Sequence, residues 1–169
     1  FLYVWLGSAA PMLARPSILA RLLIGGSTIW FVVSSLLVFP HSQSYFNELC
    51  GGPTGGPKVL LGSSVEWGQD LYFLKAWIRE HPEAEPLFVG WHPPALHPRQ
   101  AGIDKPSPPP YPSTGWYAVS MNRLYEADSP CAYLQNFQPV DHVAYSVNIY
   151  QLTEDDLRAW QETRKISDK

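Results

Sequence analysis

The densest group of side chains able to do chemistry lies in the block GSSVEWGQD. Glu66, Gln69 and Asp70 offer carboxylate and amide groups that could hydrogen-bond sugar hydroxyls. Trp67 stands among them and could stack on a pyranose face. Two carboxylates four residues apart do not by themselves make a divalent-cation site. A purely structural interpretation stays open, in which Ser64 and Asp70 favour a helix start and Trp67 packs in the core.

Other candidate groups are sparse. His92 and His97 flank a Pro-Pro-Ala-Leu stretch, but no cysteine or carboxylate nearby completes a metal site. We therefore predict no metal and no cofactor for this chain. The remaining histidines are isolated and are expected at the surface or at helix ends: His41, His81 and His142. No GxSxG, P-loop or HExxH motif is present, and no catalytic residue is assigned.

A strand before residues 66–70 and a helix after them would position this block. The apolar run at 58–63 predicts the strand, and a helix is expected near 68–81, where Pro82 stops it. One face of that helix repeats with helical spacing: Trp67, Leu71, Leu74 and Ile78. Residues 86–91 read as a second strand, and a parallel pair of these strands requires a right-handed crossover.

The rest of the chain completes an α/β fold. Residues 92–114 are rich in proline and are expected to form a long irregular loop. Alternating apolar residues predict strands at 116–121 and 144–152, and Thr153 is expected to cap a final helix that begins at about Glu154. The predicted domain has about four strands and two to three short helices.

Charge divides the chain into two environments. All fifteen Asp and Glu lie at or beyond Glu48, and only Arg15 and Arg21 of the twelve Lys and Arg precede it. Leu22 to Phe39 has neither charge nor proline, and as a helix of about 27 Å it approaches the roughly 30 Å of a hydrocarbon core. We predict that it crosses a membrane, the alternative being a buried helix of a soluble protein. A formal charge of −3 excludes an electrostatic footprint for nucleic acid.

The positive-inside bias predicts the orientation of this segment. Both early arginines lie within 7–21, which we place in the cytoplasm, and residues 40–169 are then extracytoplasmic. The expected location is the cell (inner) membrane, in a multi-pass protein. Cys50 and Cys131 would both lie outside, where a disulfide is permitted.

Three parts follow from this organisation. Residues 1–39 end a transmembrane region, with the tail of one helix, a short cytoplasmic loop and a last transmembrane helix. Residues 40–57 form a connector rich in glycine and proline, and residues 58–169 form the extracytoplasmic α/β domain.

Four blocks in this order resemble the C-terminal end of bacterial membrane glycosyltransferases of the GT-C fold, the protein O-mannosyltransferase and aminoarabinose transferase group. They are FPHSQSYFNELCGGP, GSSVEWGQDLYFLKAWI, GWYAVS and FQPVDHVAYSVNIYQL. The resemblance implies a sugar donor carried on polyprenyl phosphate, a lipid bilayer around the enzyme, and a glycan, lipid or protein acceptor. It also implies that the catalytic acid lies in the first extracytoplasmic loop, outside this chain.

The match is partial at the block that holds the candidate site. The family pattern D-S-N-x-D-W-G-Q-D retains Trp67, Gly68, Gln69 and Asp70 here, whereas Glu66 replaces an aspartate and both Gly62 and Ser64 depart from the pattern. If the block binds a polar ligand, it has lost one carboxylate and one amide. The alternative function is a membrane-tethered, non-catalytic outer domain that binds glycan or a protein partner.

Overall fold

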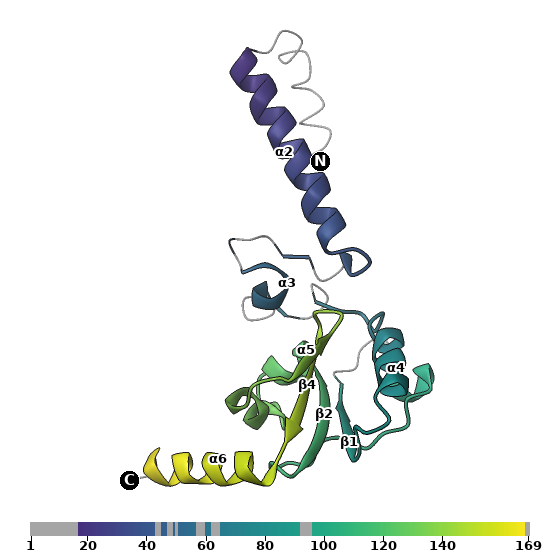
Figure 1. Cartoon of the computed structure of the whole chain (residues 1–169), viewed down its shortest axis with the longest axis vertical. Helices are drawn as coiled ribbons and strands as arrows, with labels where there is room; N and C mark the ends of the chain where they lie inside the picture. Colours follow the sequence, from purple (N-terminus) through teal and green to yellow (C-terminus); the bar gives the residue numbers. More distant parts are fainter. Residues whose placement is uncertain are drawn as a thin grey trace. The chain divides into compact units, whose positions relative to one another are not determined.

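A computed structural model describes residues 17–42, 45–46, 49, 51–56, 60–61, 65–91 and 96–167. The chain divides into two compact units, Phe1–Pro40 and His41–Lys169 (Figure 1).

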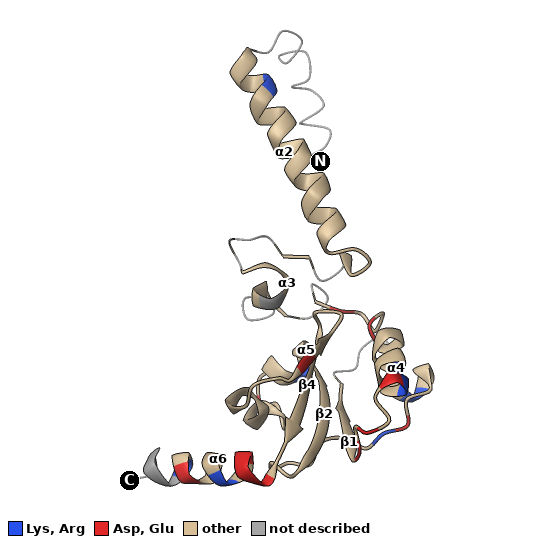
Figure 2. Ribbon diagram, viewed as in Figure 1, with Lys and Arg blue, Asp and Glu red and all other residues tan. Residues whose placement is uncertain are grey.

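The first unit contains one long apolar helix, α2 (Ile18–Leu37). The Ser17 hydroxyl accepts a hydrogen bond from the Ala20 amide at 3.2 Å, which starts the helix four residues before the predicted Leu22. Twenty residues rise about 30 Å, and the helix is long and apolar enough to cross a membrane. Serine and threonine hydroxyls bond back to helix carbonyls, as Thr28 does to Ile24 at 2.8 Å. Figure 2 shows no acidic residue on α2.

The second unit contains a mixed four-stranded sheet in the order β1-β2-β4-β3. Its strands are β1 (Leu87–Gly90), β2 (Gly115–Ser120), β3 (Asp141–Val143) and β4 (Val147–Leu152). β1 pairs in parallel with β2, and β4 runs antiparallel to both β2 and β3. Three of these strands were predicted, and β3 was not.

The predicted strand at 58–63 falls largely outside the described residues. Leu60 and Leu61, which are described, lie in no strand. The parallel partner of β1 is therefore β2, reached through residues 91–114. Pro98–Ala101 form a 3₁₀ turn, η6, within that segment, which we had predicted to be irregular throughout.

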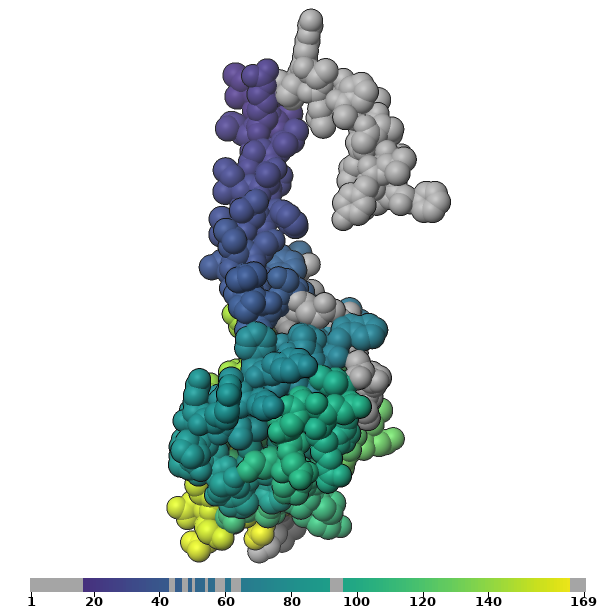
Figure 3. All heavy atoms as spheres, turned by 90° about the vertical axis from the view of Figure 1, so that its right-hand side faces the viewer, coloured from purple at the N-terminus to yellow at the C-terminus, as the bar shows by residue number. Residues whose placement is uncertain are grey.

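Helices cover both faces of the sheet. α4 (Leu71–Glu80) and η6 pack on one face, against a core that includes Ala118 and Ile149. The short α5 (Met121–Tyr125) and the 3₁₀ helix η7 (Ala132–Asn136) belong to the core on the other face, with Tyr117 and Tyr150. β2 supplies alternate side chains to the two cores, as the period of a strand requires. Figure 3 shows the side that α4 and the following loop cover, in teal and green.

The unit also contains the one-turn helix α3 (Gly52–Gly55) and the terminal helix α6 (Glu154–Ser167). The predicted cap of α6 is confirmed, because the Thr153 hydroxyl accepts from the Asp156 amide at 3.3 Å. The acidic first turn of α6 is visible in Figure 2. The four-stranded α/β unit is as predicted, and α3 together with the 3₁₀ turns makes it richer in helices than expected.

Candidate functional site

The block that holds the candidate residues forms a corner in front of α4. Gly68 has a φ of +100°, which side-chain-bearing residues rarely adopt, and an added Cβ would lie 2.7 Å from the Leu96 Cβ. This turn keeps the helix from starting before Leu71. Trp67 therefore lies outside the apolar face predicted for it, and 56% of its surface is exposed. The buried residues of α4 are Leu71, Leu74 and Trp77, and the predicted Ile78 packs half-buried against the same core.

Asp70 is the centre of the corner and is fully buried. Its Oδ2 accepts a hydrogen bond of 2.6 Å from the Ser146 hydroxyl and one of 3.2 Å from the Gln69 amide. The Gln69 Oε1 in turn accepts from the Trp67 backbone amide at 2.7 Å, so that this side chain ties the turn together. Asp70 occupies the N-cap position and makes no side-chain cap hydrogen bond, whereas the structural interpretation expected it in the first turn and Ser64, which lies outside the described residues, at the cap.

Glu66 is a second buried carboxyl in the same corner, only 3% exposed. Burial, with a smaller contribution from the Asp70 charge, raises the pKa of Glu66 to about 8. Burial also raises the pKa of Asp70, against the opposing effect of its hydrogen bonds and of His41. At neutral pH Glu66 is therefore mostly a neutral acid that can donate a hydrogen bond. Its Oε2 has no hydrogen-bond partner among the described residues.

His41 completes the corner, although its sequence position gave no reason to place it there. Its ring lies 4.5 Å from the Phe73 ring and 5.8 Å from the Tyr145 ring, both edge to face. The His41 Nδ1 stands 3.7 Å from the Asp70 Oδ1, and neither atom has a hydrogen-bond partner within the described part of the chain. A protonated imidazole would pair with the ionised carboxylate across this distance.

The structure thus brings the four predicted residues together but presents them differently. Trp67 is exposed and Gln69 half-buried, whereas the carboxyls of Glu66 and Asp70 are buried and burial raises the pKa of both. Ligand binding by Glu66, Trp67, Gln69 and Asp70 stays a prediction. The missed residues are His41 and Ser146, which lie far from the block in sequence and reach it only through the folding of the sheet.

The other candidate histidines and cysteines, where the structure describes them, make local structural contacts. His97 caps η6, accepting from the Arg99 amide at 3.3 Å, while His92 lies outside the described residues. Cys131 is a buried free thiol, and burial raises its pKa. Cys50, the cysteine with which a disulfide would be permitted, lies outside the described residues. No group of three His, Cys, Asp or Glu among the described residues is arranged to hold a metal ion.

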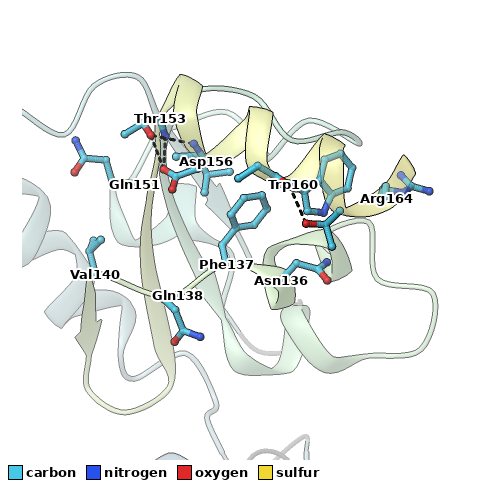
Figure 4. Close-up of a pocket in the computed structure, with 12 residues that line it drawn as sticks. Asn136, Phe137, Gln138, Val140, Gln151, Thr153, Asp156, Trp160 and Arg164 are labelled. Atoms are coloured by element: carbon cyan, nitrogen blue, oxygen red, sulfur yellow. Dashed lines mark hydrogen bonds between the residues drawn. The ribbon is translucent and has the colours of Figure 1, made fainter. Parts of the chain in front are cut away.

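Two hollows mark the opposite side of the sheet from α4. One, of about 780 Å³, lies along α6, where the Phe137 and Trp160 rings are 6.4 Å apart and Arg164 stands over Trp160 (Figure 4). The other, of about 370 Å³, lies between α3, α5 and the β3–β4 hairpin. Phe137 and Gln138 line both, so the segment that carries them separates the two hollows.

The fold defines a mixed α/β domain preceded in the chain by an apolar helix of membrane-crossing length. The chain matches no protein-family model, no curated protein and no solved structure.

Proposed function

We propose that this chain is the C-terminal portion of an integral-membrane glycosyltransferase that moves a sugar from a polyprenyl-phosphate carrier to an extracytoplasmic acceptor. In this proposal α2 is the last membrane helix, residues 40–169 are extracytoplasmic, and the catalytic acid belongs to a part of the enzyme outside this chain. The outer domain supplies a rigid cap beside the reaction, and Trp67 offers an aromatic face to a sugar.

One observation carries the proposal. Three of the blocks on which the resemblance depends converge on a single carboxylate. Asp70 belongs to the second block. The Ser146 hydroxyl, from the fourth block, lies 2.6 Å from the Asp70 Oδ2, and the His41 Nδ1, from the first block, lies 3.7 Å from the Asp70 Oδ1. Residues from three separate blocks thus hold one corner of this fold. A chance resemblance of short segments would not be expected to select them together.

The membrane location draws support from the first unit. Large side chains along α2 are exposed on all sides, Leu23, Phe31 and Leu36 at 65–70% among them. Such a surface costs free energy in water, because each exposed apolar Å² is unfavourable by about 25 cal/mol. A hydrocarbon environment removes that cost.

A transfer assay on the intact protein that contains this chain tests the proposal. The protein is purified in detergent and incubated with polyprenyl-phosphate-linked tritiated mannose or aminoarabinose, together with a membrane extract as the source of acceptor. We expect label to leave the polyprenyl carrier only when the protein is present. Recovery of the protein in the supernatant after ultracentrifugation without detergent, or no release of label from either donor, would contradict the proposal.

A non-catalytic outer domain that binds glycan is the second candidate, and the exposed Trp67 beside a polar corner favours it. The two candidates differ in what a Trp67→Ala substitution does. If the domain is only a binding module, the Trp67→Ala variant retains less glycan than the unsubstituted protein. Neither of these two proteins then turns over the donor. A transferase would turn over donor, and the substitution would act on the rate of transfer.

A further inference from the structure

The smaller hollow on the α5 side of the sheet has the features of a binding site that the proposed function does not use. Its volume of about 370 Å³ falls in the range of small-molecule pockets. Its walls come from segments far apart in the sequence: the α3 turn, α5, η7, residues 137–139 and the β3–β4 hairpin. It is separate from the Asp70 corner and shares no lining residue with it.

The floor of this cavity is a chain of hydrogen-bonded polar side chains. The Asn148 Nδ2 donates to the Tyr150 hydroxyl at 2.9 Å, and the Asn148 Oδ1 lies 2.8 Å from the His142 Nδ1. Asn148 and Tyr150 are only 4% and 2% exposed, so burial fixes their orientation. Because the amide oxygen only accepts, the His142 Nδ1 must carry a proton, and in the neutral ring Nε2 is then an acceptor.

Two hydrogen-bond donors of the floor have no acceptor among the described residues. Burial raises the pKa of Tyr150 to about 12, so its hydroxyl keeps a proton. That hydroxyl accepts from Asn148, and no described residue accepts its own proton. Asn148 has a second N–H that likewise has no acceptor among the described residues.

The rim adds further neutral groups. The Gln135 Nε2 donates to the Leu124 carbonyl at 2.8 Å, which anchors the side chain and leaves its Oε1 as an acceptor. The exposed Gln138 also lines the cavity, and Tyr125 and Phe137 supply aromatic surface. The described lining contains no Asp, Glu, Lys or Arg.

We propose that this cavity binds one neutral sugar ring. A ligand with several hydroxyl groups matches the alternating donors and acceptors of the floor and rim, and its apolar ring face matches the aromatic walls. A wholly apolar ligand would leave the buried amide and hydroxyl unpaired, and an anion would find no cationic side chain in the described lining. The inference goes beyond the proposed function, because it assigns saccharide binding to a second site and requires no sugar transfer.

Saturation-transfer NMR on the full chain tests the inference, in a detergent whose headgroup is not a sugar. The probes are the methyl α-glycosides of mannose, glucose and galactose, with methyl β-glucuronide and inorganic phosphate as charged comparisons. We expect at least one neutral glycoside to bind saturably and more tightly than either charged probe. No donor lipid is present, so the result is independent of transferase activity.

Two matched glutamine substitutions locate the binding. Gln135→Ala removes one hydrogen-bonding group from the cavity and is expected to raise the dissociation constant about five- to tenfold. Gln151 lines the neighbouring α6 hollow and not this cavity (Figure 4), so Gln151→Ala is expected to leave the dissociation constant unchanged. His142→Ala is the second cavity variant, and a urea unfolding curve for each protein shows that it is folded.

Three results would overturn the inference. They are no saturable binding of any neutral glycoside, tighter binding of glucuronide or phosphate, and equal weakening by Gln135→Ala and Gln151→Ala.

Discussion

Two polar regions of the unit His41–Lys169 differ in burial and in charge. The Asp70 corner is sealed and carries ionisable groups, because Glu66 and Asp70 are at most 3% exposed. The smaller hollow, which we call the Asn148 cavity, opens to solvent. The polar and aromatic groups of its described lining are neutral amides, aromatic rings and one histidine. Sealed carboxyls are expected to affect stability and its pH dependence, whereas exposed neutral groups are accessible to a ligand.

The largest expected effect is the pH dependence of the corner. Glu66 has a folded-state pKa of about 8 against 4.5 for the unfolded chain. Between these values the folded protein keeps a proton that the unfolded chain releases, so the free energy of unfolding falls as pH rises, by about 1.4 kcal/mol per pH unit. Urea unfolding followed by tryptophan fluorescence from pH 4.5 to 8 should show a total loss on the order of 5 kcal/mol. Asp70 shifts in the same direction.

A substitution isolates the group responsible for this slope. Glu66→Gln mimics the protonated carboxyl and should flatten the profile, with most of the gain in stability at pH 8. Glu83→Gln, at an exposed position, is the matched control and should leave the profile as it was. A Glu66→Gln protein with an unchanged slope would show that another group titrates.

The next effect tests the apolar support of the corner. Leu71 follows Asp70, is fully buried and packs in the α4 core, so Leu71→Ala should lower the free energy of unfolding by about 3 kcal/mol. Tyr72→Ala, at the next position and 65% exposed, should change it by about 0.5 kcal/mol or less. Urea midpoints of the two variants at pH 6 give the comparison, and equal losses would mean that α4 packs differently.

A smaller loss should follow from Ser146→Ala. The substitution removes the 2.6 Å hydrogen bond to Asp70 and leaves a buried carboxyl with one partner fewer, which costs about 1–3 kcal/mol. The cost should be greater above the pKa of Asp70 than below it, because the Ser146 hydrogen bond favours the ionised carboxylate. Ser107→Ala, at an exposed site, serves as the control. A loss of stability that does not change with pH would show that the Ser146 hydroxyl acts independently of the ionisation of Asp70.

The smallest effect on stability is expected for Trp67→Ala. The side chain is 56% exposed, so its removal should change the urea midpoint by an amount equivalent to about 0.5 kcal/mol or less. If Trp67 stacks on a sugar, the same variant should lose retention on an immobilised oligosaccharide. Retention equal to that of the unmodified chain would remove Trp67 from the predicted site.

The sequence predicted those features that depend on local periodicity. Alternating apolar residues located β2 and β4, and helical spacing located Leu71 and Leu74 on the buried face of α4. β3 escaped because it is only three residues long and begins with Asp141 and His142, which carry no apolar alternation. The prediction placed Trp67 on the buried face of α4 because it extended the helical repeat through Gly68. The positive φ of Gly68 separates Trp67 from the helix.

The candidate site was predictable only in part, for a related reason. Glu66 to Asp70 are contiguous, so their types and spacing drew attention at once. Ser146 is 76 residues from Asp70, and nothing local distinguishes it from other serines of the chain. The Asn148 cavity is less visible still, since its walls unite a connector turn, two short helices and a hairpin that the sequence pattern does not place side by side.

The position of β2 in the sheet has a consequence for biosynthesis. Its parallel neighbour β1 is made before it and its antiparallel neighbour β4 well after it, with β4 also holding the edge strand β3. Until the ribosome has passed Leu152, the nascent chain exposes both apolar faces of an incomplete sheet. The sheet of this unit can therefore be completed only after β4 has been synthesised, and an incomplete sheet is the kind of intermediate that tends to aggregate.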